Sequence, residues 1–203
     1  MEISPQPETQ AINPSNSLLT IQNKPNITSN ILKNIDHTFL IEILFSNQKI
    51  KSAELLYCSE QHEKSPKTFH EKCDGVANTL ILIETTENRR FGGFTSIPWS
   101  SKEGWVEGNG TDFIFSLCKK TKFLNNDRKD CAIYNHSNCF PCFGGGCDIG
   151  LLGNCFVNDQ SAHAFFPFSY GVGAELDIRG HFYFAGNDEF QVLRLEVFRI
   201  DFH

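Results

Sequence analysis

Apolar residues recur at every fourth position between residues 30 and 45, which is the spacing of an amphipathic helix. The face they define consists of Ile31, Ile35, Phe39 and Ile43, with Leu32, Leu40 and Leu44 beside it. Either Ser29 or Asn30 can cap the first turn, because both side chains accept hydrogen bonds from free backbone N–H groups. We therefore predict a helix over residues 30–45.

A second helix is indicated by Ser65 and Pro66, because a serine cap followed by proline in the first turn is a common helix start. Phe69 lies inside the predicted helix. Gly75 can end it, since glycine adopts the left-handed conformation without steric cost.

From residue 79 onward the pattern is that of short strands separated by loops rich in glycine, asparagine and aspartate. Residues 79–85 and 90–96 flank a polar turn and predict a hairpin. The other predicted strands are residues 53–58, 112–117, 131–134, 146–152, 181–185 and 190–200. Together these elements predict a predominantly β, α+β fold, a two-sheet antiparallel β-sandwich flanked by short helices.

Composition divides the chain of 203 residues into two parts. Residues 1–29 are rich in Asn, Pro, Ser, Thr and Gln, so we expect a disordered leader that buries too little apolar surface to offset its ordering entropy. Residues 30–203 hold all 19 phenylalanines, which suits one domain with a core that needs no metal or disulfide.

The net charge of −6, with no run of more than two basic residues, argues against nucleic acid as a partner. No apolar stretch approaches the ~18 residues of a membrane span, and the first thirty residues lack the pattern of a signal peptide. We expect a cytoplasmic protein whose eight cysteines stay reduced.

Four cysteines fall within seventeen residues, at Cys139, Cys142, Cys147 and Cys155. Such a cluster raises the possibility of a zinc site. Zinc sites usually pair two Cys-x2-Cys units across a longer gap, whereas only one such unit is present here, with Pro141 inside it. We expect free thiols, no bound metal and no cofactor.

Motifs of nucleophilic or phosphate chemistry are missing from the sequence: it contains no GxSxG, no GxxxxGK[ST] and no HExxH. His70 and Cys73 are spaced so that they could meet on a helix as a thiol–imidazole pair. No third orienting group is evident, so we interpret this spacing as coincidence.

The glycines say more about the structure than these absent motifs do. Gly92 and Gly93 interrupt a good strand pattern, which indicates a bulge or a close backbone approach. Gly144, Gly145 and Gly146 precede Asp148 and could cradle a phosphate, but a phosphate loop normally leads into a helix. The following residues look extended, so we predict a tight turn that leads into a strand.

In the last predicted strand, alternation places Leu193, Leu195 and Val197 on one face. Glu196 then shares the other face with apolar residues, so we expect a partly buried carboxylate paired to a basic side chain or to backbone N–H groups of a neighbouring strand. A role for Glu196 as general acid or base is the alternative.

The order of these segments resembles the TLDc domain family. The segments that carry the resemblance are residues 55–57, 69–75, 79–83, 91–96, 98–99, 113–117, 143–146, 148–149, 169–170 and 195–198. The resemblance covers about residues 50–202. It implies a β-sandwich flanked by helices, no catalytic residues, a role in protection against oxidative stress, and binding to the vacuolar proton-pumping ATPase. It also implies attachment to endolysosomal membranes only through such a partner.

The cysteine cluster departs from the family pattern, because residues 138–143 stand where the family usually has Tyr-Gly-Pro followed by Ser or Thr, and Cys147 stands where it often has His. Two hypotheses follow. The chain is a protein-interaction module in which Gly92, Gly93, Gly144, Gly145, Gly146, Asp148 and Glu196 are structural or interaction residues. Alternatively, it is a thiol-dependent or hydrolytic enzyme with a site near Cys147, His163 or Glu196.

Overall fold

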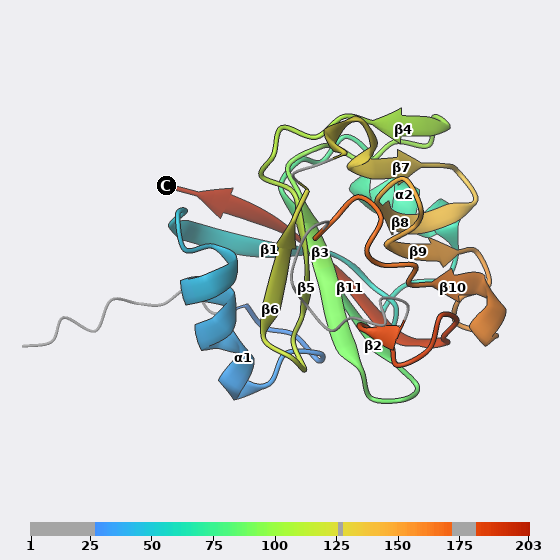
Figure 1. The fold of residues 1–203 in the computed structure, drawn as a ribbon, viewed down its shortest axis with the longest axis horizontal. Coiled ribbons are helices and arrows are strands. Elements are labelled where there is room, and N and C mark those ends of the chain that lie inside the picture. The colour runs from blue at the N-terminus through green and yellow to red at the C-terminus, as the bar shows by residue number, and fades with distance from the viewer. Residues whose placement is uncertain (1–26, 126–127, 172–181) are drawn as a thin grey trace, which may run out of the picture.

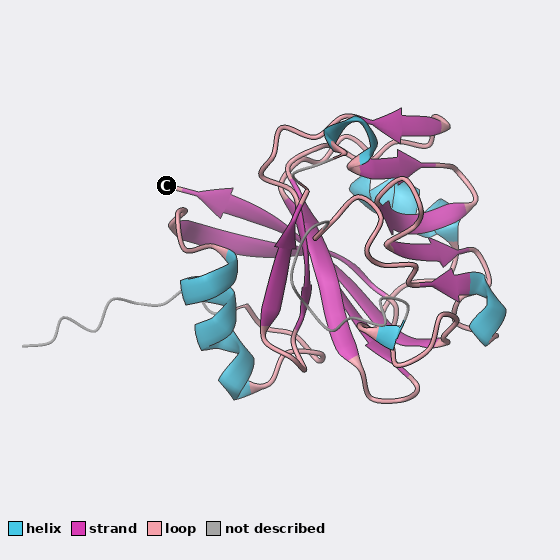
Figure 2. Cartoon of the chain, viewed as in Figure 1, coloured by secondary structure: helices cyan, strands magenta, loops and turns pink. Residues whose placement is uncertain are grey.

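The computed structural model describes residues 27–125, 128–171 and 182–203, which form two antiparallel sheets with short helices around them (Figures 1 and 2). The six-stranded sheet has the order β1-β11-β2-β3-β5-β6, with β1 Ile50–Cys58, β2 Thr79–Thr85, β3 Arg90–Thr95, β5 Phe113–Ser116, β6 Thr121–Leu124 and β11 Val192–Phe202. The five-stranded sheet has the order β10-β9-β8-β7-β4, with β4 Gly104–Val106, β7 Ile133–Asn135, β8 Cys139–Phe143, β9 Ile149–Leu152 and β10 Ala162–His163. The predicted fold class is confirmed.

The helical elements are short. They are α1 Asn34–Phe39, the π-helical turn η1 Leu40–Leu44, α2 Pro66–Cys73, and the 3-10 turns η2 Lys129–Cys131 and η3 Asp159–Ser161. Figure 1 shows α1 and the five-stranded sheet on opposite sides of the six-stranded sheet. Within the described ranges, no helix has the length and apolar character needed to cross a membrane.

Strand β2 is buried along its whole length because both of its faces are covered. Ile81 and Ile83 point into the core between the two sheets, where they join Leu195 and Phe143. Leu80 and Leu82 point the other way, into a second core beneath the N-terminal helical segment. A strand covered on both faces needs a continuous apolar run, which explains the sequence Thr-Leu-Ile-Leu-Ile.

The N-terminal helical segment differs from the prediction. The helix begins at Asn34 rather than at residue 30, and Ile35 and Ile43 are exposed. The buried stripe consists instead of Asp36, Leu40 and Leu44, which are spaced four residues apart. Phe39 and the residues predicted beside the stripe, Leu40 and Leu44, are buried as expected, so the prediction was wrong for Ile35 and Ile43 and missed the buried acidic residue Asp36.

The second predicted helix is confirmed at both ends. The Ser65 hydroxyl accepts a hydrogen bond from the backbone N–H of Thr68, and Pro66 is the first helical residue. Gly75 follows the helix with φ +76°, the left-handed conformation expected for its end.

Strand β11 contains a bulge that changes the predicted alternation. A register shift between Val192 and Arg194 adds one residue to β11 relative to β2. Val192 therefore joins Leu195 and Val197 in the core between the sheets, whereas Leu193 is exposed. Our assignment of Leu193 to the same face as Leu195 and Val197 was wrong for this reason.

Two further strand predictions need correction. Residues 182–185 form a turn rather than a strand, and His181 lies outside the described residues. Strand β8, which contains Pro141, was not predicted because proline is uncommon inside strands.

The expected leader also overlaps the folded part of the chain. Ile27 is 2 % exposed and belongs to the second core. Residues 1–26 lie outside the described ranges.

Candidate functional site

Gly92 and Gly93 allow close packing in the centre of the six-stranded sheet. A Cβ atom at Gly93 would lie 2.5 Å from the ring of Phe143 in the opposite sheet. A Cβ atom at Gly92 would lie 1.9 Å from the carbonyl oxygen of Ile81 on β2. Both distances are far below van der Waals contact. The missing side chains therefore let β2 lie close to Gly92 and the ring of Phe143 lie close to Gly93.

The glycine triplet forms a tight turn between β8 and β9. The N–H of Cys147 donates to the carbonyl of Gly144 at 3.0 Å, and Gly144 has φ +82°. A Cβ atom at Gly144 would lie 1.9 Å from Oδ2 of Asp148, and one at Gly146 would lie 2.5 Å from the ring of Phe168. The turn leads into a strand rather than a helix, so its geometry is that of a packed turn and not of a helical phosphate loop.

Asp148 connects this turn to residues 168–170. Its Oδ1 accepts the N–H of Phe168 at 2.5 Å, and its Oδ2 accepts the N–H of Ser169 at 2.8 Å. The Ser169 hydroxyl in turn accepts the N–H of Gly145 at 2.8 Å. The structure thus brings together the glycine triplet, Asp148 and Ser169, which are separate in the sequence.

The carboxyl group of Asp148 is fully buried. Burial raises its pKa to about 6, although hydrogen bonds from the backbone N–H groups of Phe168 and Ser169 oppose this rise. In the described part of the chain Asp148 forms no ion pair with Lys, Arg or His. Its hydrogen bonds go to backbone, so its geometry fits a residue that fixes the loop.

The four clustered cysteines do not converge on one point. Cys142 and Cys147 have their sulfur atoms 3.3 Å apart, and Cys155 is fully buried in the core between the sheets. Among the described residues, no three His, Cys, Asp or Glu side chains are arranged so that they could hold a metal ion. The cysteines are free thiols.

Glu196 lies on the outer face of β11 and is 2 % exposed. It accepts hydrogen bonds from the Ser29 hydroxyl and, at 3.0 Å, from the backbone N–H of Asn30. We expected a basic side chain or backbone N–H groups of the neighbouring sheet; one partner is a backbone N–H group, but both partners come from the segment before α1. No local pattern indicates this contact, because the two partners are 166 and 167 residues away.

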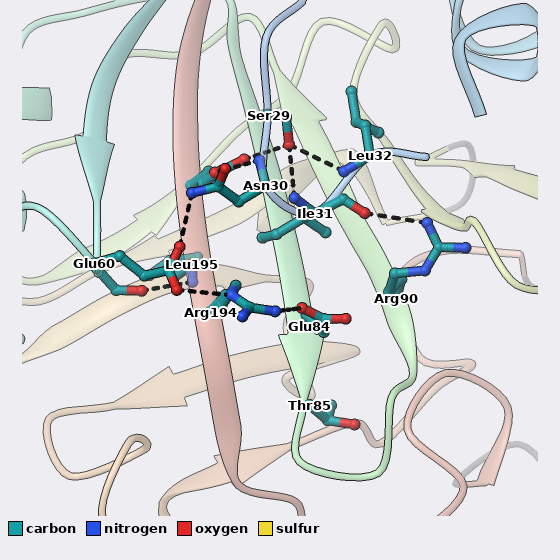
Figure 3. A network of polar contacts seen from close by, with 12 residues as sticks. Ser29, Asn30, Ile31, Leu32, Glu60, Glu84, Thr85, Arg90, Arg194 and Leu195 are labelled. Atoms are coloured by element: carbon teal, nitrogen blue, oxygen red, sulfur yellow. Dashed lines mark hydrogen bonds and ion pairs between the residues drawn. The ribbon is translucent and has the colours of Figure 1, made fainter. Parts of the chain in front are cut away.

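Figure 3 shows the polar network around this contact. The Ser29 hydroxyl also accepts the N–H groups of Ile31 and Leu32, each at 3.0 Å, and so fixes the turn that leads into α1. Arg194, two residues before Glu196, bridges Glu60 and Glu84 at 2.8 and 2.7 Å. The network fastens the N-terminal segment to the sheet.

The three residues of the alternative enzymatic hypothesis are not all brought together. Cys147 and His163 belong to the five-stranded sheet and its turn. Glu196 binds Ser29 on the outer face of the six-stranded sheet, on the far side of the core between the sheets. The three side chains therefore do not form one site.

The His70–Cys73 pair is not an activated thiol either. Nδ1 of His70 lies 2.6 Å from Asp74, and Nε2 lies 3.0 Å from the carbonyl of His136 and 3.1 Å from that of Cys139. Burial raises the pKa of the Cys73 thiol to about 12, so it stays protonated. His70 instead ties α2 to the loop before β8.

One surface of the molecule combines exposed aromatic and acidic side chains. An open hollow of about 440 Å³ is lined by Asp159, Phe165, Phe182, Asn187, Asp188 and Glu189. Phe182 is 50 % exposed and Phe165 is 37 % exposed. Single exposed aromatic residues are ordinary, whereas here two of them line one hollow together with acidic side chains. We call this the Phe165–Phe182 hollow.

Comparison with known proteins places these features in a family. The model of the TLDc domain matches residues 25–201. A curated relative, TBC1 domain family member 24 from Xenopus tropicalis, is 35 % identical over 68 residues, which cover 31 % of this chain and 12 % of that protein. The chain therefore corresponds to a small part of this relative. Because the family model spans nearly all of the chain, including every residue of the glycine turn and Glu196, the chain belongs to the TLDc domain family.

Proposed function

We propose that this chain is a non-catalytic interaction module that binds a peripheral subunit of the vacuolar proton-pumping ATPase and contributes to protection against oxidative stress. The observation that carries the proposal is the match of the TLDc family model to residues 25–201. In this proposal the chain is cytoplasmic and reaches endolysosomal membranes only through the pump.

The use of the family-motif residues supports binding rather than turnover. Gly92, Gly93 and Gly144 are needed for packing, Asp148 is bound to backbone N–H groups, and Glu196 is bound to the N-terminal segment. A catalytic group needs a free polar atom that can reach a substrate. These residues therefore build the scaffold, and recognition falls to the surface.

We assign that recognition to the Phe165–Phe182 hollow. Its aromatic rings offer apolar area, and the carboxylates of Asp159 and Glu189 line the same hollow. Such a surface suits a partner segment that carries Lys or Arg beside apolar residues, because complementary charge steers association and aromatic anchors supply affinity.

Co-sedimentation of the purified protein with pump-bearing membranes tests the proposal. We expect the protein to sediment with these membranes and not with membranes stripped of the pump's peripheral subunits. The Phe182→Ser variant should lose at least about tenfold in affinity, the effect of a hot-spot residue that contributes more than about 1.4 kcal/mol. Ile43→Ser is the matched control, because Ile43 is 51 % exposed on η1 and does not line the hollow.

Equal sedimentation with stripped membranes would overturn the proposed partner. Equal loss for both variants would overturn the assigned surface. The enzymatic alternative is tested in parallel by following peroxide consumption in the presence of a thiol reductant. Sustained turnover that disappears in Cys147→Ser, without association with the pump, would favour the enzyme.

A further inference from the structure

The thiols of Cys142 and Cys147 meet across the glycine turn. Their sulfur atoms lie 3.3 Å apart, whereas a disulfide bond is about 2.05 Å long, so they need to approach by only about 1.2 Å. Cys142 is held in β8, where it pairs with Tyr134 and Gly150. The turn brings Cys147 back over this strand, since Cys147 donates its N–H to Gly144.

The surroundings of the two sulfur atoms are shaped to hold them together. A Cβ atom at Gly150 would lie 3.2 Å from Sγ of Cys147, closer than ordinary contact, and 3.5 Å from Sγ of Cys142, so the missing side chain leaves room for Cys147 beside Cys142. Cys147 itself adopts φ +56°, a conformation that non-glycine residues rarely take and that the surrounding structure must enforce.

The two thiols differ in a way that assigns a role to each. Cys147 is partly exposed, whereas Cys142 is 4 % exposed. A hydrogen bond from the Cys142 thiol lowers the pKa of Cys147, against the opposing effects of burial and of Asp148. The same contact and burial raise the pKa of Cys142. The thiolate is the reactive form of cysteine, so Cys147 is the attacking group and Cys142 is the resolving group.

We propose that Cys147 and Cys142 form a peroxide-sensitive dithiol that closes to an intramolecular disulfide. The Cys147 thiolate attacks one oxygen of hydrogen peroxide, the O–O bond breaks, and hydroxide leaves as Cys147 becomes a sulfenic acid. The Cys142 sulfur then attacks the Cys147 sulfur, the S–O bond breaks, and water leaves. Overall two thiols lose two electrons and two protons to one peroxide, which becomes two waters. A small dithiol reverses the reaction by exchange.

This proposal concerns a modification of the chain and does not depend on the pump as partner. It also differs from the enzymatic alternative, because its test uses equimolar peroxide without reductant and measures a single closure rather than turnover. The test treats reduced full-length protein with equimolar hydrogen peroxide, unfolds it, blocks the remaining thiols with N-ethylmaleimide, and measures the intact mass. We expect two fewer alkylated thiols and the loss of two hydrogen atoms, both restored by dithiothreitol.

Single cysteine substitutions test which two thiols form the disulfide. Cys147→Ser should abolish the closure. Cys142→Ala should also abolish it and leave a sulfenic acid that dimedone labels. Cys139→Ser is the matched control and should close like the unmodified protein, because Cys139 belongs to the same cluster but makes no sulfur contact at this distance. Melting curves of the reduced variants establish that each is folded.

Closure that persists in Cys142→Ala or disappears in Cys139→Ser would overturn the assigned pair. The protein without substitutions provides an independent test of the proposal. If Cys142 and Cys147 both remain open to alkylation at a peroxide concentration that already oxidises the exposed thiol of Cys118, the proposal is wrong.

Discussion

Asp36 and Arg90 are 54 residues apart in the sequence and form a buried ion pair that joins the N-terminal helix to the start of β3. Lys120 binds the other carboxylate oxygen of Asp36. Arg90 also donates to the carbonyl of Ile31 at 3.1 Å. One acidic side chain on α1 therefore holds two cations from the sheet, and the helix is fixed by charge as well as by the apolar contacts of Leu40 and Leu44.

Removing the charge of Asp36 should be costly. Asp36→Asn leaves the buried guanidinium of Arg90 without its counter-ion, and we expect a loss of about 3–5 kcal/mol in the free energy of unfolding, measured by urea denaturation. Asp201→Asn makes the same chemical change in a surface pair with Arg199 and should cost no more than about 1 kcal/mol. Equal losses would contradict a special role for the buried pair.

Asp148 should give the protein a distinct dependence on pH. Burial raises its pKa from 3.8 to about 6, so the stability that the protonated form contributes is present below pH 3.8 and is lost as pH rises through about 6. Asp148→Asn removes this dependence. Relative to the unmodified protein, the variant should gain up to about 3 kcal/mol between pH 4 and 7, because one pKa unit corresponds to about 1.4 kcal/mol.

Denaturant unfolding at several pH values measures this difference. The pKa of Asp36 is shifted in the opposite direction, so this residue provides the control. Burial would raise its pKa, but hydrogen bonds from Lys120, the backbone of Lys33 and Arg90 lower it below 3.8. Its contribution is therefore present above pH 3.8 and lost only as pH falls further. A stability difference for Asp148→Asn that stays constant from pH 4 to 7 would show that this carboxyl group keeps its ordinary pKa.

Gly144→Ala should destabilise the glycine turn in two ways. The residue has φ +82°, and the added Cβ would overlap Oδ2 of Asp148 at 1.9 Å. We expect a loss above about 2 kcal/mol. Gly75→Ala separates the two effects, because Gly75 has φ +76° but nothing within 4 Å of the added carbon. It should cost only about 1 kcal/mol. Equal losses in thermal or urea unfolding would show that contact with Asp148 contributes nothing.

Local signals in the sequence predicted local structure well. The hairpin of β2 and β3 and the start of α2 each depend on neighbouring residues, namely a polar turn and the Ser65–Pro66 cap. Glycine in place of larger residues at Gly92 and Gly93 also indicated close packing, although the sequence does not say which atoms approach. The ring of Phe143 comes from the opposite sheet, 50 residues later.

Contacts between distant segments could not be predicted. The partners of Glu196 and Asp36 depend on how the N-terminal segment crosses the sheet, which no local pattern encodes. The bulge at Val192 reverses the alternation of β11 without any glycine or proline to mark it. In the candidate site, the sequence indicated the cluster of cysteines. It did not indicate that Cys142 lies against Cys147, because that contact depends on the geometry of the glycine turn.

Gly93→Ala should be rescued by a smaller residue at position 143. The added Cβ would lie 2.5–2.8 Å from three atoms of the Phe143 ring, so we expect a loss of about 1–3 kcal/mol from overpacking. Phe143→Leu frees space at the same point. In a double-mutant cycle the two changes together should cost less than the sum of the single changes, with a coupling of at least about 0.5 kcal/mol. Strict additivity would show that strain arises elsewhere.

The N-terminal boundary of the stable domain should lie between residues 25 and 30. Deleting residues 1–24 should change the melting temperature by no more than about 2 °C, because about 1 kcal/mol shifts a domain of this size by about 2–4 °C. Deleting residues 1–30 removes the buried Ile27 and both partners of Glu196. Burial of one such side chain contributes about 1.5–3 kcal/mol, and a buried unpaired carboxylate costs about 1–3 kcal/mol more.

The longer deletion should therefore lower the melting temperature by more than about 6 °C. Ser29→Ala in the full chain tests the same anchor without a deletion, because it removes one hydrogen bond to the buried carboxylate of Glu196 and the cap on the N–H groups of Ile31 and Leu32. Ser52→Ala is its control, since Ser52 makes an exposed hydrogen bond to Asp201 at 2.8 Å and should have little effect. If the two deletions melt alike, the segment around Ser29 does not stabilise the sheet, and the buried position of Glu196 must be maintained by β11 and its neighbours alone.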